Sequence, residues 1–314
     1  MSKNQDPNLV PRITGLLILE VRKSNPNGDP ERESSPRQRP DGKGEISPVS
    51  VKRKLRDLVL EKEGVVWQEV KKTLEIPNDD GFQILESRGR DRVSIETEIM
   101  ENRFVAKYWD ARLFGNTFLE DADKLKDRHK KASDEELAKV KNNIRAGVCH
   151  FGVGVSIAPI EIEFSTWTNK SGVETGKDRG MAPMAFRVVK HSVYAVPFFV
   201  NPNLAHKTGC TKLDVDLMLH LLKHTYAGNR SVVRSMVEVI HAHTFTHNSR
   251  AGSVSDFVFL DALMPKKNGN PDKPSESLAD YGDLPTWEKI KDLPVRSGSK
   301  VTFAQCGEYK DYAL

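Results

Sequence analysis

A basic cluster in residues 51–56 has the residue types and spacing that suit phosphate binding. Its cations are Lys52, Arg53, Lys54 and Arg56. Each lysine or arginine that contacts a phosphate releases condensed counterions, so clustered cations are a common means of holding nucleic acid. A solvated helix face would give the same pattern, and from the residues alone both interpretations stay open.

A second cluster follows Gly228-Asn229 and consists of Arg230, Ser231 and Arg234. If this segment is helical, its two arginines share one face, because residues four apart are neighbours on a helix. The planar guanidinium group suits bidentate phosphate contacts and stacking on bases. The alternative is an exposed helix start with no ligand.

The turn Asn25-Pro26-Asn27-Gly28-Asp29-Pro30 is the most unusual local sequence of the chain. Its prolines, glycine and asparagines end any strand or helix. Such a turn presents backbone N–H groups and the Asn25 and Asn27 side chains to phosphate. It lacks the GxxxxGK[ST] and GxGxxG patterns of nucleotide-binding loops, so a rigid double turn is an equally good interpretation.

A polar, glycine-rich segment at residues 169–183 lies between two predicted strands. It carries three cations and a methionine: Lys170, Lys177, Arg179 and Met181. Together with Met184, Met181 would form an apolar tip able to wedge between bases. Internal packing of these methionines is the alternative.

No catalytic or metal-binding pattern stands out. His220 and His224 share a predicted helix face, and His241 and His243 share a strand face. Four imidazoles bind zinc if two such elements meet, but the helical pair lacks the glutamate of HExxH, and we expect no metal. Asp29 is the one carboxylate in a suspected nucleic-acid site, which is weak support for metal-assisted cleavage. We therefore expect a binding protein without cofactors, not an enzyme.

Composition and charge fit this expectation. The chain has 314 residues, 38% hydrophobic and 29% charged. Residues 12–56 contain eleven lysines and arginines against six acidic residues, whereas residues 256–314 contain eight against ten. The basic segment resembles the footprint of a polyanion site. Three cysteines without CxxC spacing, no long apolar run and a polar N-terminus predict a cytoplasmic protein that does not enter a membrane.

Hydrophobic periodicity predicts an α+β fold. Strands are predicted for residues 12–23, 147–168, 186–200, 236–245, 257–263 and 301–306, and helices for residues 48–62, 67–74, 96–110, 121–144 and 212–227. Ser47-Pro48 supplies a helix N-cap and a proline at the first helical position. Residues 121–144 are so rich in charge that we expect a solvated excursion, and Ser133-Asp134-Glu135-Glu136 within them predicts a capping box. The order of elements resembles a ferredoxin-like βαββαβ core with insertions.

Several segments together resemble the backbone subunit family of type I CRISPR Cascade, nearest its subtype I-C and I-B members. The turn at residues 25–30 matches the family's NPNGDP signature, and residues 51–56 match its basic first helix. Ala111-Arg112-Leu113-Phe114-Gly115 resembles an (A/V)R-x-FG segment. Residues 229–234 and 247–249 resemble two late elements, although Asn229 replaces an acidic position.

The resemblance implies a single hand-shaped domain. Its RRM-like palm would comprise residues 12–62 and 147–263, with helical finger-like insertions at residues 25–47 and 64–146 and a β-hairpin thumb at residues 164–190. Copies of the subunit would stack along a CRISPR guide RNA beside other Cascade subunits, and the exposed bases would pair with target DNA. RNA-binding residues are then expected at Asn25, Asn27, Lys52, Arg53, Arg56, Lys170, Lys177, Arg179, Met181, Arg230, Ser231 and Arg234.

Two other hypotheses stay open. One is a metal-dependent ribonuclease of the related type III backbone kind, using Asp29. The other is a monomeric RRM-like reader of RNA, which the absence of an aromatic RNP pattern disfavours. The leading hypothesis further requires that Lys52, Arg53, Arg230 and Arg234 converge on one groove.

Overall fold

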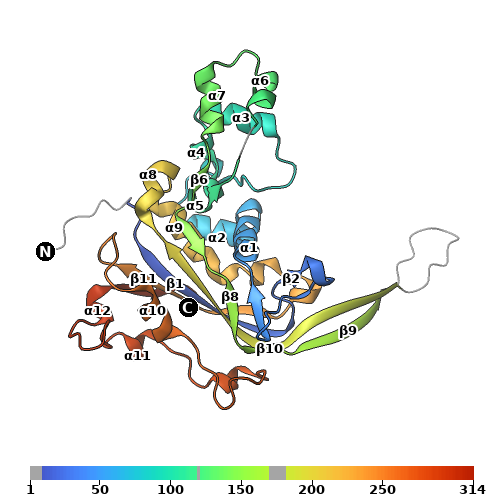
Figure 1. Ribbon diagram of the computed structural model, residues 1–314, viewed down its shortest axis with the longest axis vertical. Coiled ribbons are helices and arrows are strands. Elements are labelled where there is room, and N and C mark those ends of the chain that lie inside the picture. Colours follow the sequence, from blue (N-terminus) through green and yellow to red (C-terminus); the bar gives the residue numbers. More distant parts are fainter. Residues whose placement is uncertain (1–8, 119–120, 170–181) are drawn as a thin grey trace.

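The computed structural model describes residues 9–118, 121–169 and 182–314. Its centre is a large antiparallel sheet with the strand order β12-β11-β1-β10-β8-β4, in which β7 and β9 also pair with β10 (Figure 1). The strands are β1 (Ile13–Ser24), β4 (Lys43–Ile46), β7 (Cys149–Phe151), β8 (Gly154–Pro159), β9 (Ile162–Asn169), β10 (Ala182–Val200), β11 (Val237–His247) and β12 (Gly307–Asp311). The predicted α+β class is confirmed at this level.

Strand β1 lies in the middle of the sheet, as its continuous apolar run predicts. It pairs with β10 on one side and β11 on the other. Leu17, Leu19 and Val21 belong to one hydrophobic cluster, while Leu16 and Ile18 belong to another. Since side chains alternate along a strand, the sheet is buried on both faces.

One face, here called the helical face, is covered by α1 (Pro48–Leu60), α2 (Val65–Thr73) and α9 (Lys212–Leu221). The predicted start of α1 is confirmed, because the Ser47 side chain accepts a hydrogen bond from the Ser50 N–H and Pro48 is the first helical residue. The helix stops at Leu60, two residues before its predicted end, and Gly64 is the N-cap of α2.

The other face, here called the C-terminal face, is covered by α10 (Asp256–Leu263), α11 (Trp287–Ile290) and α12 (Phe303–Cys306) (Figure 1). Residues 257–263 and 301–306 were predicted as strands, and both predictions are wrong. Phe259, Leu260 and Leu263 face the core with helical spacing. A short apolar run without flanking turns does not distinguish a strand from a buried helix.

A separate helical lobe stands above the sheet in Figure 1. It contains α3 (Arg92–Met100), α4 (Phe104–Lys107), α6 (Ala122–Arg128) and α7 (Asp134–Lys141), and α5 (Trp109–Phe114) connects it to the sheet. The helices predicted at 96–110 and 121–144 are broken, the first near Asn102, whose φ of 59° cannot continue a helix. The predicted capping box of Ser133 and Glu136 is confirmed.

This lobe is not merely a solvated excursion, because Leu125, Leu137 and Val140 are buried in a hydrophobic cluster of its own.

A long hairpin extends from the opposite end of the sheet, where β9 and the first half of β10 pair from Ile162–Val189 to Asn169–Ala182. Pro159 is the last residue of β8, and β9 begins at Ile162. Lys170, Lys177, Arg179 and Met181 lie outside the described residues.

Shorter elements complete the chain. They are β2 (Gly28–Asp29), β3 (Ser35–Pro36), β5 (Gly115–Asn116), β6 (Arg145–Ala146), α8 (Ala205–Thr208) and the 3₁₀ turns at 30–32, 80–82, 202–204, 222–224, 227–229, 232–234 and 278–281. Within the described ranges, no helix combines the length and the apolar character needed to cross a bilayer.

Candidate nucleic-acid interface

The turn after β1 is braced by its own asparagines. Asn25 Nδ2 donates to the Ser34 carbonyl at 2.7 Å, and Asn27 Oδ1 accepts from the Ser47 N–H at 2.7 Å. Gly28 passes so close to Ser34 that an added Cβ would lie 2.9 Å from its carbonyl oxygen. These contacts favour the rigid double turn, which fixes the start of α1. A direct phosphate contact by Asn25 or Asn27 stays a prediction.

The turn at Asn25 also meets the second basic cluster. Arg234 Nε donates to the Asn25 carbonyl at 3.2 Å. Across from it, the Lys54 ammonium group bonds Ser50 Oγ at 2.8 Å and lies 4.6 Å from the centre of the Tyr226 ring. We call this group of five residues, drawn from the turn after β1, from α1 and from the segment after α9, the Lys54–Arg234 cluster.

Lys54 is a buried cation without a carboxylate partner. Lys54 is 5% exposed. Within the described part of the chain, neither Lys54 nor Arg234 forms an ion pair with an acidic group. Burial, followed by the positive charge of Arg234, lowers the pKa of Lys54 to about 7, although Asp57 acts in the opposite direction. A buried charge normally requires a partner, so this cluster favours the approach of an anion.

Lys52 and Arg56 lie on a different flank of α1. Lys52 Nζ is 5.3 Å from the centre of the Phe114 ring, and the Arg56 guanidinium is also 5.3 Å from it. Burial, with the nearby Arg56 charge, lowers the pKa of Lys52. Arg56 is committed to a 2.7 Å ion pair with Asp110, so Lys52 is the cation on this flank that is free of a carboxylate among the described residues.

The remaining predicted cations are exposed and paired. Arg53 bonds Asp57 at 2.6 Å and the Glu86 carbonyl at 3.0 Å. Arg230 lies 3.8 Å from Glu238 and is 56% exposed in its side chain. Ser231 is exposed and its side chain caps nothing.

Helix α9 ends at Leu221, six residues before its predicted end, and 3₁₀ turns follow. Arg230 and Arg234 therefore do not share a helix face, because only Val232–Arg234 is helical, as a single 3₁₀ turn. The structure brings Asn25 and Arg234 together, whereas Lys52 contacts Phe114 and Arg53 contacts Asp57. A single groove formed by Lys52, Arg53, Arg230 and Arg234 stays a prediction.

The RNA-binding residues expected from the sequence do not include Lys54 and Tyr226 of this cluster. Lys54 is the last cation of the run at 52–54, and helical geometry predicts that it points away from Lys52 and Arg53, since successive residues are about 100° apart around the axis. Nothing in the sequence marks Tyr226, whose ring is brought to Lys54 only by the packing of residues after α9 against α1.

The Asp29 carboxylate caps a turn and lies beside two arginines. It accepts from the Glu31 N–H at 3.2 Å and lies 3.8 Å from Arg37 and 4.0 Å from Arg32. Within residues 9–118, 121–169 and 182–314, no group of three potential metal ligands includes it. Asp29 is best explained as the cap of the turn that follows β1.

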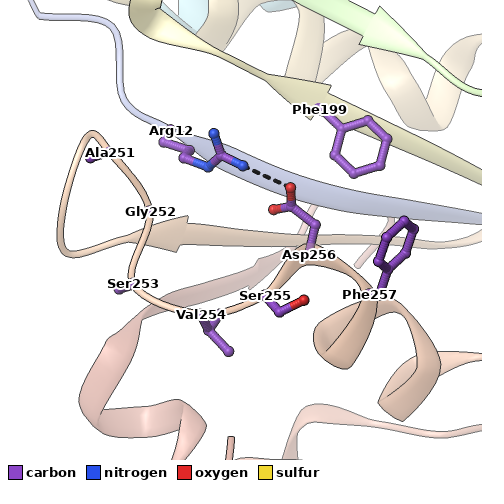
Figure 2. A pocket seen from close by; sticks show the side chains of 9 residues that line it. All are labelled: Arg12, Phe199, Ala251, Gly252, Ser253, Val254, Ser255, Asp256 and Phe257. Carbon is purple, nitrogen blue, oxygen red and sulfur yellow. Dashed lines mark hydrogen bonds and ion pairs between the residues drawn. The ribbon is translucent and has the colours of Figure 1, made fainter.

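A pocket at the start of α10 is a second candidate for binding. Figure 2 shows Arg12 bonded to Asp256 at 2.7 Å, with Phe199 and Phe257 to one side. Asp256 also accepts a hydrogen bond from Thr14. Because its cation is already neutralised, this pocket is a poor match for a polyanion.

Comparison with known proteins identifies the family of this chain. The family model described as "CRISPR-associated protein Cas7" matches residues 11–285. A curated relative from Haloferax volcanii, also described as CRISPR-associated protein Cas7, is 24% identical over an alignment of 223 residues that covers 64% of this chain and 60% of the relative. The chain thus spans about three fifths of the length of that relative.

Solved structures are more distant. A CRISPR RNA-guided surveillance complex in a pre-nicking state contains a chain with 15% identity and a TM-score of 0.41, covering 75% of this chain and 78% of the other. A type III-B Cmr-β complex bound to cognate target RNA contains one with 11% identity and a TM-score of 0.37, covering 75% and 61%. Scores this low carry no argument about function.

The family match covers most of the chain and includes the turn after β1, α1 and the segment after α9. This chain belongs to the CRISPR-associated Cas7 family.

Proposed function

We propose that this protein is a non-catalytic backbone subunit that binds CRISPR guide RNA without regard to sequence. The observation that carries the proposal is the Lys54–Arg234 cluster, where cations without carboxylate partners meet at a turn that belongs to the family match. Contacts to phosphate fix the position of a nucleic acid and carry no sequence information. A subunit that must hold any spacer sequence needs contacts of this kind.

The palm in this proposal is the part of the sheet formed by β11, β1, β10 and β8. Their spatial order, with α1 after β1 and α9 after β10, supports an RRM-like arrangement. An RRM binds RNA on the open face of its sheet. Here that face is buried beneath α10–α12, so the guide is expected along the α1 side of the palm instead.

The hairpin of β9 and β10 is the proposed thumb, and the helical lobe with α3, α4, α6 and α7 is the proposed finger. Copies would stack head to tail, with each thumb over RNA held by the next copy. Such a contact does not close on itself and builds a helical filament. Other Cascade subunits, target DNA paired with the guide and a cytoplasmic location are parts of the same proposal.

Fluorescence anisotropy with two single-stranded RNAs of unrelated sequence tests the RNA-binding part. The variants are Lys52→Ala with Arg53→Ala, and Arg230→Ala with Arg234→Ala. Each double variant is expected to weaken the binding of both RNAs by about tenfold or more. The loss should be equal for the two sequences, because the lost contacts are electrostatic. Lys289→Ala with Lys291→Ala is the matched control on α11, where both lysines are paired with acidic groups.

Normal affinity in both test variants would remove these residues from the proposal. The non-catalytic part is tested separately by incubating RNA with the protein and Mg²⁺. Intact RNA is the expected result, whereas cleavage that Asp29→Ala abolishes would establish the ribonuclease alternative.

A further inference from the structure

Strands β11 and β12 bring two imidazoles and a carboxylate together at an edge of the sheet. Residues 241 and 243 are two apart on β11, and Asp311 is the register partner of His243 on β12. Within the described part of the chain, His241, His243 and Asp311 are the one group of three potential metal ligands whose donor atoms all lie within 4.8 Å of one another.

Both histidines point at the same carboxylate oxygen. Asp311 Oδ2 is 2.7 Å from His241 Nδ1 and 3.6 Å from His243 Nδ1. The two rings are stacked, with centroids 4.6 Å apart and an angle of 15° between their planes. Two nitrogens and one oxygen therefore converge on one small volume.

The carboxylate is held in this orientation by the backbone. Asp311 Oδ1 accepts hydrogen bonds from the N–H groups of Ala242 and Ala313, at 2.8 and 3.0 Å. Outer contacts of this kind commonly orient a metal ligand. The fixed Oδ1 leaves Oδ2 for the histidines.

Hydrogen bonding alone does not satisfy His243. Its side chain is 1% exposed, and its Nε2 atom has no partner. Its Nδ1 lies between Asp311 and the Tyr309 hydroxyl, which is 2.7 Å away. His241 is 17% exposed in its side chain, so the group is open to solvent on one side.

We propose that His241, His243 and Asp311 bind a divalent transition-metal ion such as Zn²⁺, with a fourth position open to water. Imidazole nitrogen and carboxylate oxygen bind zinc at about 2.0–2.2 Å, which places the ligand atoms of a tetrahedral site about 3.3 Å apart. The distances from Asp311 Oδ2 to the two Nδ1 atoms, 2.7 and 3.6 Å, bracket this value. Small side-chain movements would therefore bring these ligand atoms to the spacing that the ion requires.

The ion would join the edge strand β12 to β11 and so anchor the end of the C-terminal face. The four-histidine arrangement considered from the sequence does not form this group. His220 Nδ1 bonds the Asp216 carbonyl at 2.8 Å, and its ring lies against Tyr312 instead.

Titration of metal-stripped full-length protein with Co²⁺ tests the site, because tetrahedral Co²⁺ has intense visible absorption bands that octahedral Co²⁺ lacks. We expect these bands at one equivalent, and their loss when one equivalent of Zn²⁺ is added. His241→Gln and Asp311→Asn are expected to weaken Zn²⁺ binding by about 100-fold or more, and His220→Gln, the matched control, by less than about twofold.

The wild-type spectrum decides the question even if a variant fails to fold. Only the weak bands of octahedral Co²⁺, or equal Zn²⁺ affinity in His241→Gln and His220→Gln, would overturn the site. A matching readout is thermal unfolding, in which Zn²⁺ is expected to raise the midpoint of the wild type and of His220→Gln but not of Asp311→Asn. Neither measurement involves RNA, so the site stands or falls independently of the proposed function.

Discussion

The C-terminal face of the sheet and the Lys54–Arg234 cluster differ in whether their charged side chains are paired. On the C-terminal face, Arg12 pairs with Asp256 and His191 with Glu20, both within 3.2 Å. In the Lys54–Arg234 cluster, Lys54 is 5% exposed but has no carboxylate partner among the described residues.

This difference separates groups that hold the fold together from groups that favour a ligand. A paired charge has already recovered part of its desolvation cost inside the protein, whereas an unpaired buried cation recovers it only when an anion arrives. The predictions below test whether pairing separates structural from RNA-binding cations.

The largest effect on stability is expected when one partner of a buried ion pair is removed. Arg112 and Asp214 connect α5 to α9 by two hydrogen bonds of 2.6 and 3.0 Å, with side chains 8% and 1% exposed. Asp214→Ala leaves a buried guanidinium uncompensated and is expected to lower the free energy of unfolding by about 3–5 kcal/mol, as measured by urea denaturation.

Lys54→Met is the contrasting variant, and it is expected to raise stability near pH 7. The folded pKa of Lys54, about 7, is below its unfolded value of 10.5. The cost of burying the charge is therefore complete below pH 7 and disappears as the pH rises towards 10.5, so the advantage of the variant should shrink over that window. If Lys54→Met lowered the free energy of unfolding and Asp214→Ala left it unchanged, the contrast between paired and unpaired charges would be wrong.

The second effect is a pH dependence of RNA binding. A phosphate near Lys54 favours its charged form, so binding should take up a proton above pH 7. The affinity of the wild type is expected to fall by about tenfold between pH 7 and pH 9. Anisotropy titrations at constant ionic strength measure this, and Lys54→Arg, which stays charged, should bind equally at both values. A wild type that binds equally at both would exclude Lys54 from the interface.

A smaller effect is expected in the salt dependence. For single strands, the logarithm of the binding constant falls with the logarithm of salt concentration by about 0.7 per neutralised phosphate. Arg230→Ala with Arg234→Ala should therefore make the slope shallower by about 1.4 if both arginines contact phosphate, and by about 0.7 if only Arg234 does. An unchanged slope would assign both residues to the fold alone.

The smallest effect is expected where a cation is paired and exposed. Arg103 pairs with Glu101 on the surface of the helical lobe, and its side chain is 58% exposed. Such pairs contribute little to stability. Arg103→Ala is expected to change neither the unfolding midpoint nor RNA affinity, and weaker RNA binding would extend the interface into the lobe.

Local signals predicted the elements where several rules agree. The apolar run at residues 13–21 predicted β1, Ser47-Pro48 predicted the start of α1, and Ser133 with Glu136 predicted the capping box of α7. Prediction failed at α10 and α12, where a few apolar residues fit both the helix and the strand periodicity. Packing against the sheet decides between helix and strand there.

By itself, the sequence determined that this chain has a central buried strand, a capped basic helix and the ordered motifs of its family. Tertiary structure decided which cations act together. The run Lys52-Arg53-Lys54 is continuous in sequence, yet helix geometry turns its members to three sides of α1. There they meet Phe114, the Glu86 carbonyl and Tyr226 respectively, and only Lys54 meets Arg234, because these partners come from elements distant in the chain.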